Sequence, residues 1–164
     1  MRYYLALDLA MVNIGWAIFD SENFELIRTG TFQNPKLVDD KMIDLTHRAA
    51  LMFRFADRII EEVNEQIIGV IAERPHGTRS VSDAMTFGVV ASFCAYMSEI
   101  KHMNMIYVGV QEIKRFNNEI IPEDMDPKTK SKIVARELES LDLPEHEADA
   151  VCAFHFWQTL LPKT

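Results

Sequence analysis

Four residues of the kind that bind divalent metal ions stand out in the sequence. Asp8 interrupts an apolar run near the start of the chain, Glu73 ends another apolar run, and His146 and Asp149 lie three residues apart in the segment HEADAVCAF. Burying a carboxylate costs several kcal/mol unless its charge is compensated. Because carboxylate oxygens are the ligands that Mg²⁺ and Mn²⁺ prefer, acids and an imidazole that meet at one point predict a divalent-metal site.

Two of these acids also have purely structural interpretations. Taken alone, Asp8 is equally compatible with a turn cap or with a partner for a basic side chain. Glu73, which precedes Arg74, is compatible with an acid on the edge of a sheet. The metal site is favoured because the joint pattern is much rarer by chance than any one of its members.

The other two residues fall near the start of an expected helix, where further interpretations apply. An aspartate such as Asp149 commonly interacts there with the helix dipole, and an isolated histidine such as His146 commonly lies on the surface. Their three-residue spacing places both on one face of the helix. Glu145 and Glu147 are expected to be solvated. Either becomes the metal ligand instead if the inward face of the helix is not the one that carries His146 and Asp149.

Hydrophobic patterns predict the elements that must position these residues. Apolar runs rich in β-forming residues predict five strands, at residues 3–9, 14–19, 24–32, 67–73 and 105–110. Helical spacing and flanking signals predict helices from Met42 to Val63 and at 82–100, 111–117, 128–140 and 144–160. Ser82 is a candidate N-cap, and Pro144 suits a first helical turn.

The order of these elements predicts the fold class. Short turns between the first three strands favour an antiparallel meander, whereas strands joined through helices favour parallel pairing across right-handed crossovers. We therefore expect an α/β fold with a five-stranded mixed sheet, made of a three-strand antiparallel meander plus two parallel strands, and helices on both faces. The chain, residues 1–164, contains no internal repeat or linker and is expected to form a single domain.

The composition is that of a globular protein, with 48% hydrophobic and 26% charged residues. No apolar run is long enough to span a bilayer, and the N-terminus lacks a secretory signal pattern, so we expect a cytoplasmic protein without membrane association. Cys94 and Cys152 lie in apolar helical segments and are expected to be reduced core residues. The net charge of −8 argues mildly against nonspecific nucleic-acid binding, although local basic surfaces matter more than the total.

Three segments together resemble a known family. The runs LALDLAMVNIGWAIFD, VIAERP and HEADAVCAF resemble the RuvC family of Holliday-junction resolvases, within the RNase H-like superfamily, and the resemblance covers nearly the whole chain. It implies an RNase H-like fold, a homodimer, and an endonuclease that acts on branched DNA such as a four-way junction. Residue by residue, it implies that Asp8, Glu73, His146 and Asp149 are catalytic and metal-binding. Ala10 stands where the family usually has a glycine, which is compatible with a diverged, phage-type member.

A site of this composition is suited to phosphodiester hydrolysis. Two divalent ions, Mg²⁺ with Mn²⁺ as a substitute, about 4 Å apart would activate a water molecule and stabilise the leaving 3′ oxygen. The central strand position of Asp8 favours a bridge between the ions, with Glu73 and Asp149 each holding one side, and His146 is either a ligand or a group that polarises the water. The expected reaction, in recombination or repair, is that of a crossover-junction endonuclease. It would make paired symmetric nicks with 5′-phosphate ends and would use no nucleotide cofactor.

Basic residues near these acids are candidate contacts to DNA phosphates. The candidates are Arg74, Arg79, Lys114, Arg115, Lys128, Lys130 and Lys132. The alternatives are a solvated helix face for residues 128–136 and a simple surface connection for the loop at 74–81. We expect the apolar helix at 82–100 to pack against the sheet on one side and a second subunit on the other, the alternative being full burial in a monomer core.

Three other functional classes compete with this hypothesis. An actin-like or sugar-kinase-like ATP-binding fragment is disfavoured, because such proteins need a glycine-rich phosphate loop and a second lobe, and the chain has only 6 glycines. A nuclease of the same superfamily that acts on flaps or RNA–DNA hybrids would keep the same site. A catalytically silent nucleic-acid-binding module would keep the fold without the reaction.

Overall fold

The computed structural model describes residues 1–63, 66–74 and 80–162, which form five strands and five α-helices. In order, the elements are β1 (Tyr3–Leu9), β2 (Asn13–Asp20), β3 (Leu26–Gln33), α1 (Lys41–Glu62), β4 (Ile67–Glu73), α2 (Val81–Ala95), the π-helical turn η1 (Tyr96–Ile100), β5 (Met105–Val108), α3 (Val110–Ile120), α4 (Pro127–Glu139) and α5 (Glu145–Gln158).

The strands form one mixed sheet with the order β3-β2-β1-β4-β5. β1 pairs antiparallel with β2, and β2 pairs antiparallel with β3. β4 is parallel to β1 on one side and to β5 on the other. This arrangement confirms the predicted meander of three strands plus two parallel strands.

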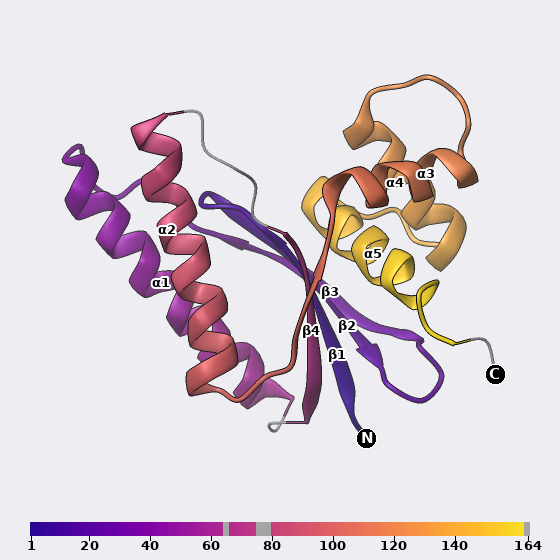
Figure 1. Cartoon of the computed structure of the whole chain (residues 1–164), viewed down its shortest axis with the longest axis horizontal. Helices are drawn as coiled ribbons and strands as arrows, with labels where there is room; N and C mark the ends of the chain where they lie inside the picture. The colour runs from indigo at the N-terminus through magenta and orange to yellow at the C-terminus, as the bar shows by residue number, and fades with distance from the viewer. Residues whose placement is uncertain (64–65, 75–79, 163–164) are drawn as a thin grey trace.

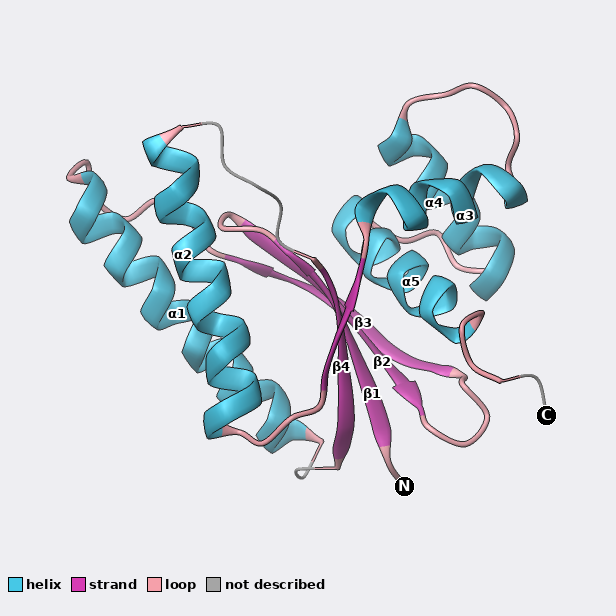
Figure 2. Ribbon diagram, in the orientation of Figure 1, coloured by secondary structure: helices cyan, strands magenta, loops and turns pink. Residues whose placement is uncertain are grey.

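Helices cover both faces of the sheet, as predicted. α1 and α2 lie against one face, and α3, α4 and α5 lie on the other (Figures 1 and 2). Because side chains alternate along a strand, Leu5 and Leu7 of β1 belong to the core beneath α1 and α2, whereas Ala6 belongs to the core beneath α5. The same alternation places Asp8 on the α5 face of the sheet.

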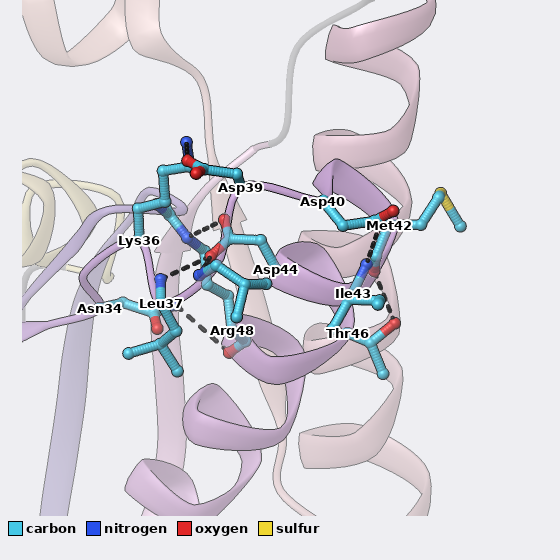
Figure 3. Close-up of polar contacts among 11 residues, drawn as sticks. Asn34, Lys36, Leu37, Asp39, Asp40, Met42, Ile43, Asp44, Thr46 and Arg48 are labelled. Carbon is cyan, nitrogen blue, oxygen red and sulfur yellow. Dashed lines mark hydrogen bonds and ion pairs between the residues drawn. The ribbon is translucent and has the colours of Figure 1, made fainter.

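The start of α1 is fixed by acidic side chains. Asp40 caps the helix by accepting a hydrogen bond from the backbone N–H of Ile43 at 3.0 Å (Figure 3). The buried carboxylate of Asp44 accepts the backbone N–H of Leu37 at 2.7 Å and pairs with Arg48 at 2.9 Å. These contacts anchor the segment between β3 and α1 to the helix it precedes.

Several predicted boundaries differ from the structure, most of them by one or two residues. The helix predicted at 82–100 begins at Val81 with Ser80, not Ser82, as its N-cap, and its last turn is π-helical. The strand predicted at 105–110 ends at Val108, and the helix predicted at 111–117 extends from Val110 to Ile120. Ser80 is the N-cap because its backbone is extended and its side chain accepts a hydrogen bond from the backbone N–H of Asp83 at 3.1 Å.

The expectations about the two cysteines and about membrane-spanning helices can also be compared with the structure. Cys94 and Cys152 are free thiols and both are buried. Within the described part of the chain, no helix combines the length and the apolar character that crossing a membrane requires.

Candidate active site

The predicted acids come together at one edge of the sheet. Asp8 lies near the carboxyl end of β1, and Glu73 is the last residue of the parallel neighbour β4. Because the carboxyl ends of parallel strands meet at the same edge, these two side chains approach each other. Asp149 lies in the second turn of α5, the helix that packs across β1 and β2 on this face.

His146 contacts Asp8 directly. Its Nδ1 atom lies 2.7 Å from Oδ2 of Asp8, and both side chains are largely sheltered, with 28% and 18% of their surfaces exposed. On the other side of the ring, Nε2 lies 3.2 Å from the amide nitrogen of Asn13, the first residue of β2. The imidazole is therefore held at both nitrogen atoms between two strands of the sheet.

The chain brings α5 unusually close to β2 at this point. A Cβ atom at Gly15 would overlap the backbone carbonyl of His146, so only glycine allows the observed approach. Farther out, the carboxylate of Glu147 accepts hydrogen bonds from Thr29 at 2.5 Å and Thr31 at 3.1 Å, both on β3. Glu147 was expected to be solvated, but it is instead an anchor that fixes the position of α5.

The turn after Asp8 does not need the glycine that the sequence lacks. Among the described residues, positive φ angles at non-glycine positions occur at Phe24, His102 and Ser140. Ala10 is not among them, so its Cβ atom causes no backbone strain there.

Burial and neighbouring negative charges raise the pKa of all three carboxyls. Burial is the main cause for Glu73, and the negative charges of Asp8 and Asp149 add to it, so its pKa rises to about 7. Burial raises the pKa of Asp149 to about 6, although a hydrogen bond from Ser131 acts in the opposite direction. Burial raises the pKa of Asp8, and the hydrogen bond with His146 acts in the opposite direction. The buried site thus disfavours the ionised form of all three carboxyls.

This donor set suits a divalent cation, because carboxylates that repel one another in a sheltered place are stabilised by a shared positive charge. In the arrangement described by the structure, no three His, Cys, Asp or Glu side chains of residues 1–63, 66–74 and 80–162 converge closely enough to form a metal cage. The chemistry of the residues fits a cation, and the assignment of Asp8, Glu73, His146 and Asp149 as ligands remains a prediction.

A cavity of about 320 Å³ opens beside the acids, between α3 and α4. Glu73 and Asp149 line it together with the basic side chains of Lys114, Lys128 and Lys130. The positive charge of Lys114 is close enough to lower the pKa of Glu73 against the effect of burial. The cavity therefore places cationic groups next to carboxylates.

The predicted DNA-binding residues occupy different environments. Lys128 is exposed and pairs with Glu145 at 2.6 Å, whereas Lys130 is buried and donates to Asn118 at 2.6 Å. Arg115 lines a separate surface depression beside α5. Of the remaining predicted contacts, Arg74, Lys114 and Lys132 are exposed and Arg79 lies outside the described residues.

Several residues of the site were not predicted from the sequence. Asn13 and Ser131 contact the predicted His146 and Asp149, and Gly15 permits the approach of α5. Gly15 carries the one usable signal, because a glycine inside a strand often marks the close approach of another backbone. Asn13 looks like an ordinary turn residue, because its partner is 133 residues away in the sequence.

Comparison with solved structures identifies the fold. RuvC of Thermus thermophilus in complex with Holliday-junction substrate matches with a TM-score of 0.71 at 12% identity, over 97% of this chain and 96% of that one. Another structure of Thermus thermophilus RuvC matches with a TM-score of 0.64 at 12% identity over the same shares. The fowlpox virus resolvase, in complex with Holliday-junction DNA, matches with a TM-score of 0.50 at 16% identity, over 98% of this chain and 100% of that one.

The likeness extends over essentially the whole length of these resolvases. It confirms the RNase H-like fold that the sequence predicts from its resemblance to RuvC. No protein-family model and no curated protein matches the sequence.

Proposed function

We propose that this chain is a divalent-metal-dependent endonuclease that resolves four-way DNA junctions by paired symmetric nicks with 5′-phosphate ends. The observation that carries the proposal is the group of three desolvated carboxyls, Asp8, Glu73 and Asp149, at one edge of the sheet. The match of the whole chain to two resolvases in complex with Holliday-junction DNA supports four-way junctions as the substrate.

Asp8, Glu73 and Asp149 are the residues that would hold Mg²⁺, or Mn²⁺ in its place, with two ions per site. When bound, such ions supply a water nucleophile at neutral pH and stabilise the leaving oxygen. The raised pKa values of Glu73 and Asp149 support this assignment, because a cation would favour the ionised carboxylates that the buried site disfavours.

The basic residues of the cavity beside the acids would bind the DNA backbone. Lys114 and Lys128 would neutralise phosphates next to the scissile bond and fix the strand by backbone contacts that carry no sequence information. Lys130, buried and held by Asn118, keeps a positive charge in the cavity wall without the conformational freedom of a surface lysine. Together they would position a strand against the carboxyls despite the acidic total charge.

A homodimer would present two such sites to the opposite strands of a junction. α2 is rich in apolar residues, and it leaves Phe87 39% exposed. The turn that extends this helix leaves Ile100 64% exposed. Exposed apolar side chains on a helix that already covers the sheet with its other side support packing against a second subunit.

Cleavage of a panel of matched substrates tests the proposed function. A labelled four-way junction, a flap, a linear duplex and an RNA–DNA hybrid of the same sequence would be incubated with Mg²⁺ and mapped for cut positions. We expect nicks at symmetric positions in the junction and little cutting of the linear duplex. Preferential cutting of the hybrid or flap would move the function to another nuclease class, and junction binding without cutting would indicate a silent binding module.

A further inference from the structure

We propose that Asn13 is a positioning residue that selects the hydrogen-bonding form of His146 and thereby orients the carboxylate of Asp8. The three side chains form a continuous relay from the start of β2, through the first turn of α5, to the end of β1. The inference deepens the proposed function, since it rests on Asp8 being a catalytic carboxylate.

The geometry determines which ring nitrogen carries the hydrogen. The amide nitrogen of Asn13 has only hydrogens to offer, and it lies 3.2 Å from Nε2 of His146. Nε2 must therefore accept. In the neutral ring the remaining hydrogen then lies on Nδ1, which is 2.7 Å from Oδ2 of Asp8 and donates to it.

Both contacts restrain the ring of His146, so the orientation of its plane and the nitrogen that carries its hydrogen are fixed together. One oxygen of Asp8 is held by the imidazole, and this restraint fixes the orientation of the whole carboxylate. Gly15 contributes by letting the backbone of His146 approach β2, which brings the ring within reach of Asn13. The relay thus depends on the close contact between Gly15 and the backbone of His146.

Asparagine is distinctive at this position because its amide presents a donor and an acceptor on the same short side chain. Aspartate has the same shape but only accepts, so Asn13→Asp would favour a hydrogen on Nε2 and weaken the donation from Nδ1 to Asp8. Alanine removes the restraint altogether. The two variants therefore separate the effect of the tautomer from the effect of side-chain volume.

The direct test is nitrogen NMR of the metal-free protein with ¹⁵N-labelled histidine, in mildly alkaline buffer. The chain has 5 histidines, so His146→Gln identifies the ring signals of residue 146 by their disappearance. We expect the wild type to carry its hydrogen on Nδ1, Asn13→Ala to give a mixture of tautomers, and Asn13→Asp to carry a hydrogen on Nε2. A wild-type ring with its hydrogen on Nε2, or one unchanged in both variants, would overturn the proposal.

Cleavage kinetics give the functional readout. We expect Asn13→Ala to lower kcat for a four-way junction about 10-fold, the low end of what the loss of an orienting hydrogen bond costs, with little change in KM. Asn13→Asp should not restore the rate, although it preserves the shape of the side chain. A fully active Asn13→Asp would contradict the role of the tautomer.

The NMR and kinetic measurements also separate this inference from the proposed function. If the wild-type protein cuts no junction but shows the Nδ1 hydrogen and its dependence on Asn13, the nuclease proposal fails and the relay stands. If the wild type cuts junctions and the tautomer does not respond to Asn13, the relay fails and the nuclease proposal stands.

Discussion

The backbone of Gly15 in β2 passes so close to the carbonyl of His146 in α5 that position 15 has no room for a Cβ atom. This contact sets the distance between the helix that carries His146 and Asp149 and the sheet that carries Asp8. The helix is held in the same place by the two threonine hydroxyls that bond Glu147. The site is therefore assembled by packing between β2, β3 and α5 as well as by the acids themselves.

Gly15→Ala should push α5 away from the sheet. Overpacking of a close-fitting interior typically costs about 1–3 kcal/mol. We expect the free energy of unfolding, measured by urea denaturation, to fall by about that amount, and junction cleavage to fall with it. Val12→Ala, at an exposed position of the adjoining turn, is the control and should change stability by less than about 0.5 kcal/mol. Equal stability of the wild type and Gly15→Ala would show that the contact does not constrain the helix.

Stability without metal should decrease as the pH rises from about 4.5 to about 7. The folded-state pKa of Glu73, about 7, is above its ordinary value of 4.5, so in this window the folded protein binds more protons than the unfolded chain. Stability then falls with increasing pH, and Asp149, with a pKa of about 6, contributes in the same direction. Urea denaturation in chelator across this range measures the slope.

Glu73→Gln is the matched variant for this pH dependence. It keeps the shape of the side chain but removes its ionisation, so the slope should be visibly shallower. Saturating Mg²⁺ should also flatten the slope in the wild type, because a cation stabilises the ionised acids. A slope that is the same in both proteins, with and without Mg²⁺, would contradict the account of Glu73.

The exposed side of α2 should control assembly. A charge buried without a partner costs several kcal/mol, so Phe87→Glu should raise the dissociation constant of the proposed dimer by about 100-fold or more. Sedimentation equilibrium over a range of protein concentrations measures this change. Leu138→Glu, at an exposed apolar position on α4, is the control and should leave the dissociation constant unchanged. A wild-type protein that sediments as a monomer at all concentrations would refute the dimer.

Lys114 should contribute one phosphate contact. Its charge acts on Glu73 and it lines the cavity beside the acids. We expect Lys114→Ala to weaken junction binding a few-fold and to reduce the slope of log affinity against log salt by about 0.9. Lys101→Ala, which removes a lysine paired with Asp57, should leave that slope unchanged. An unaltered slope in Lys114→Ala would exclude this contact.

Most of the fold was accessible from local patterns in the sequence. The strand at 67–73 has the predicted boundaries, because an uninterrupted apolar run ends there at a charged residue. The last helix begins one residue from its predicted start, because Pro144 suits a helix N-terminus. The helix predicted at 82–100 ends at Ile100 as expected, but the sequence does not indicate that its last turn, Tyr96–Ile100, is π-helical.

The acids of the candidate site stand out in the sequence, whereas the residues that support them do not. A carboxylate within an apolar run, such as Asp8, is conspicuous in sequence because its burial needs an explanation. The contact of Asn13 with His146 and the clamp on Glu147 join residues more than a hundred positions apart, and neither leaves a local pattern. Glu147 in particular looked like a solvated surface acid until the position of β3 was known.

The most direct test of the central claim is the cleavage of a labelled four-way junction by the wild type and Asp8→Asn, each with Mg²⁺, with Mn²⁺ and with chelator. We expect paired symmetric nicks with 5′-phosphate ends for the wild type with either metal, and none in chelator. Asp8→Asn should cut at a rate at least about 100-fold lower while binding the junction as well as the wild type does. Cutting by Asp8→Asn at the wild-type rate, or cutting that persists in chelator, would contradict the assignment of Asp8 to a metal-dependent nuclease site.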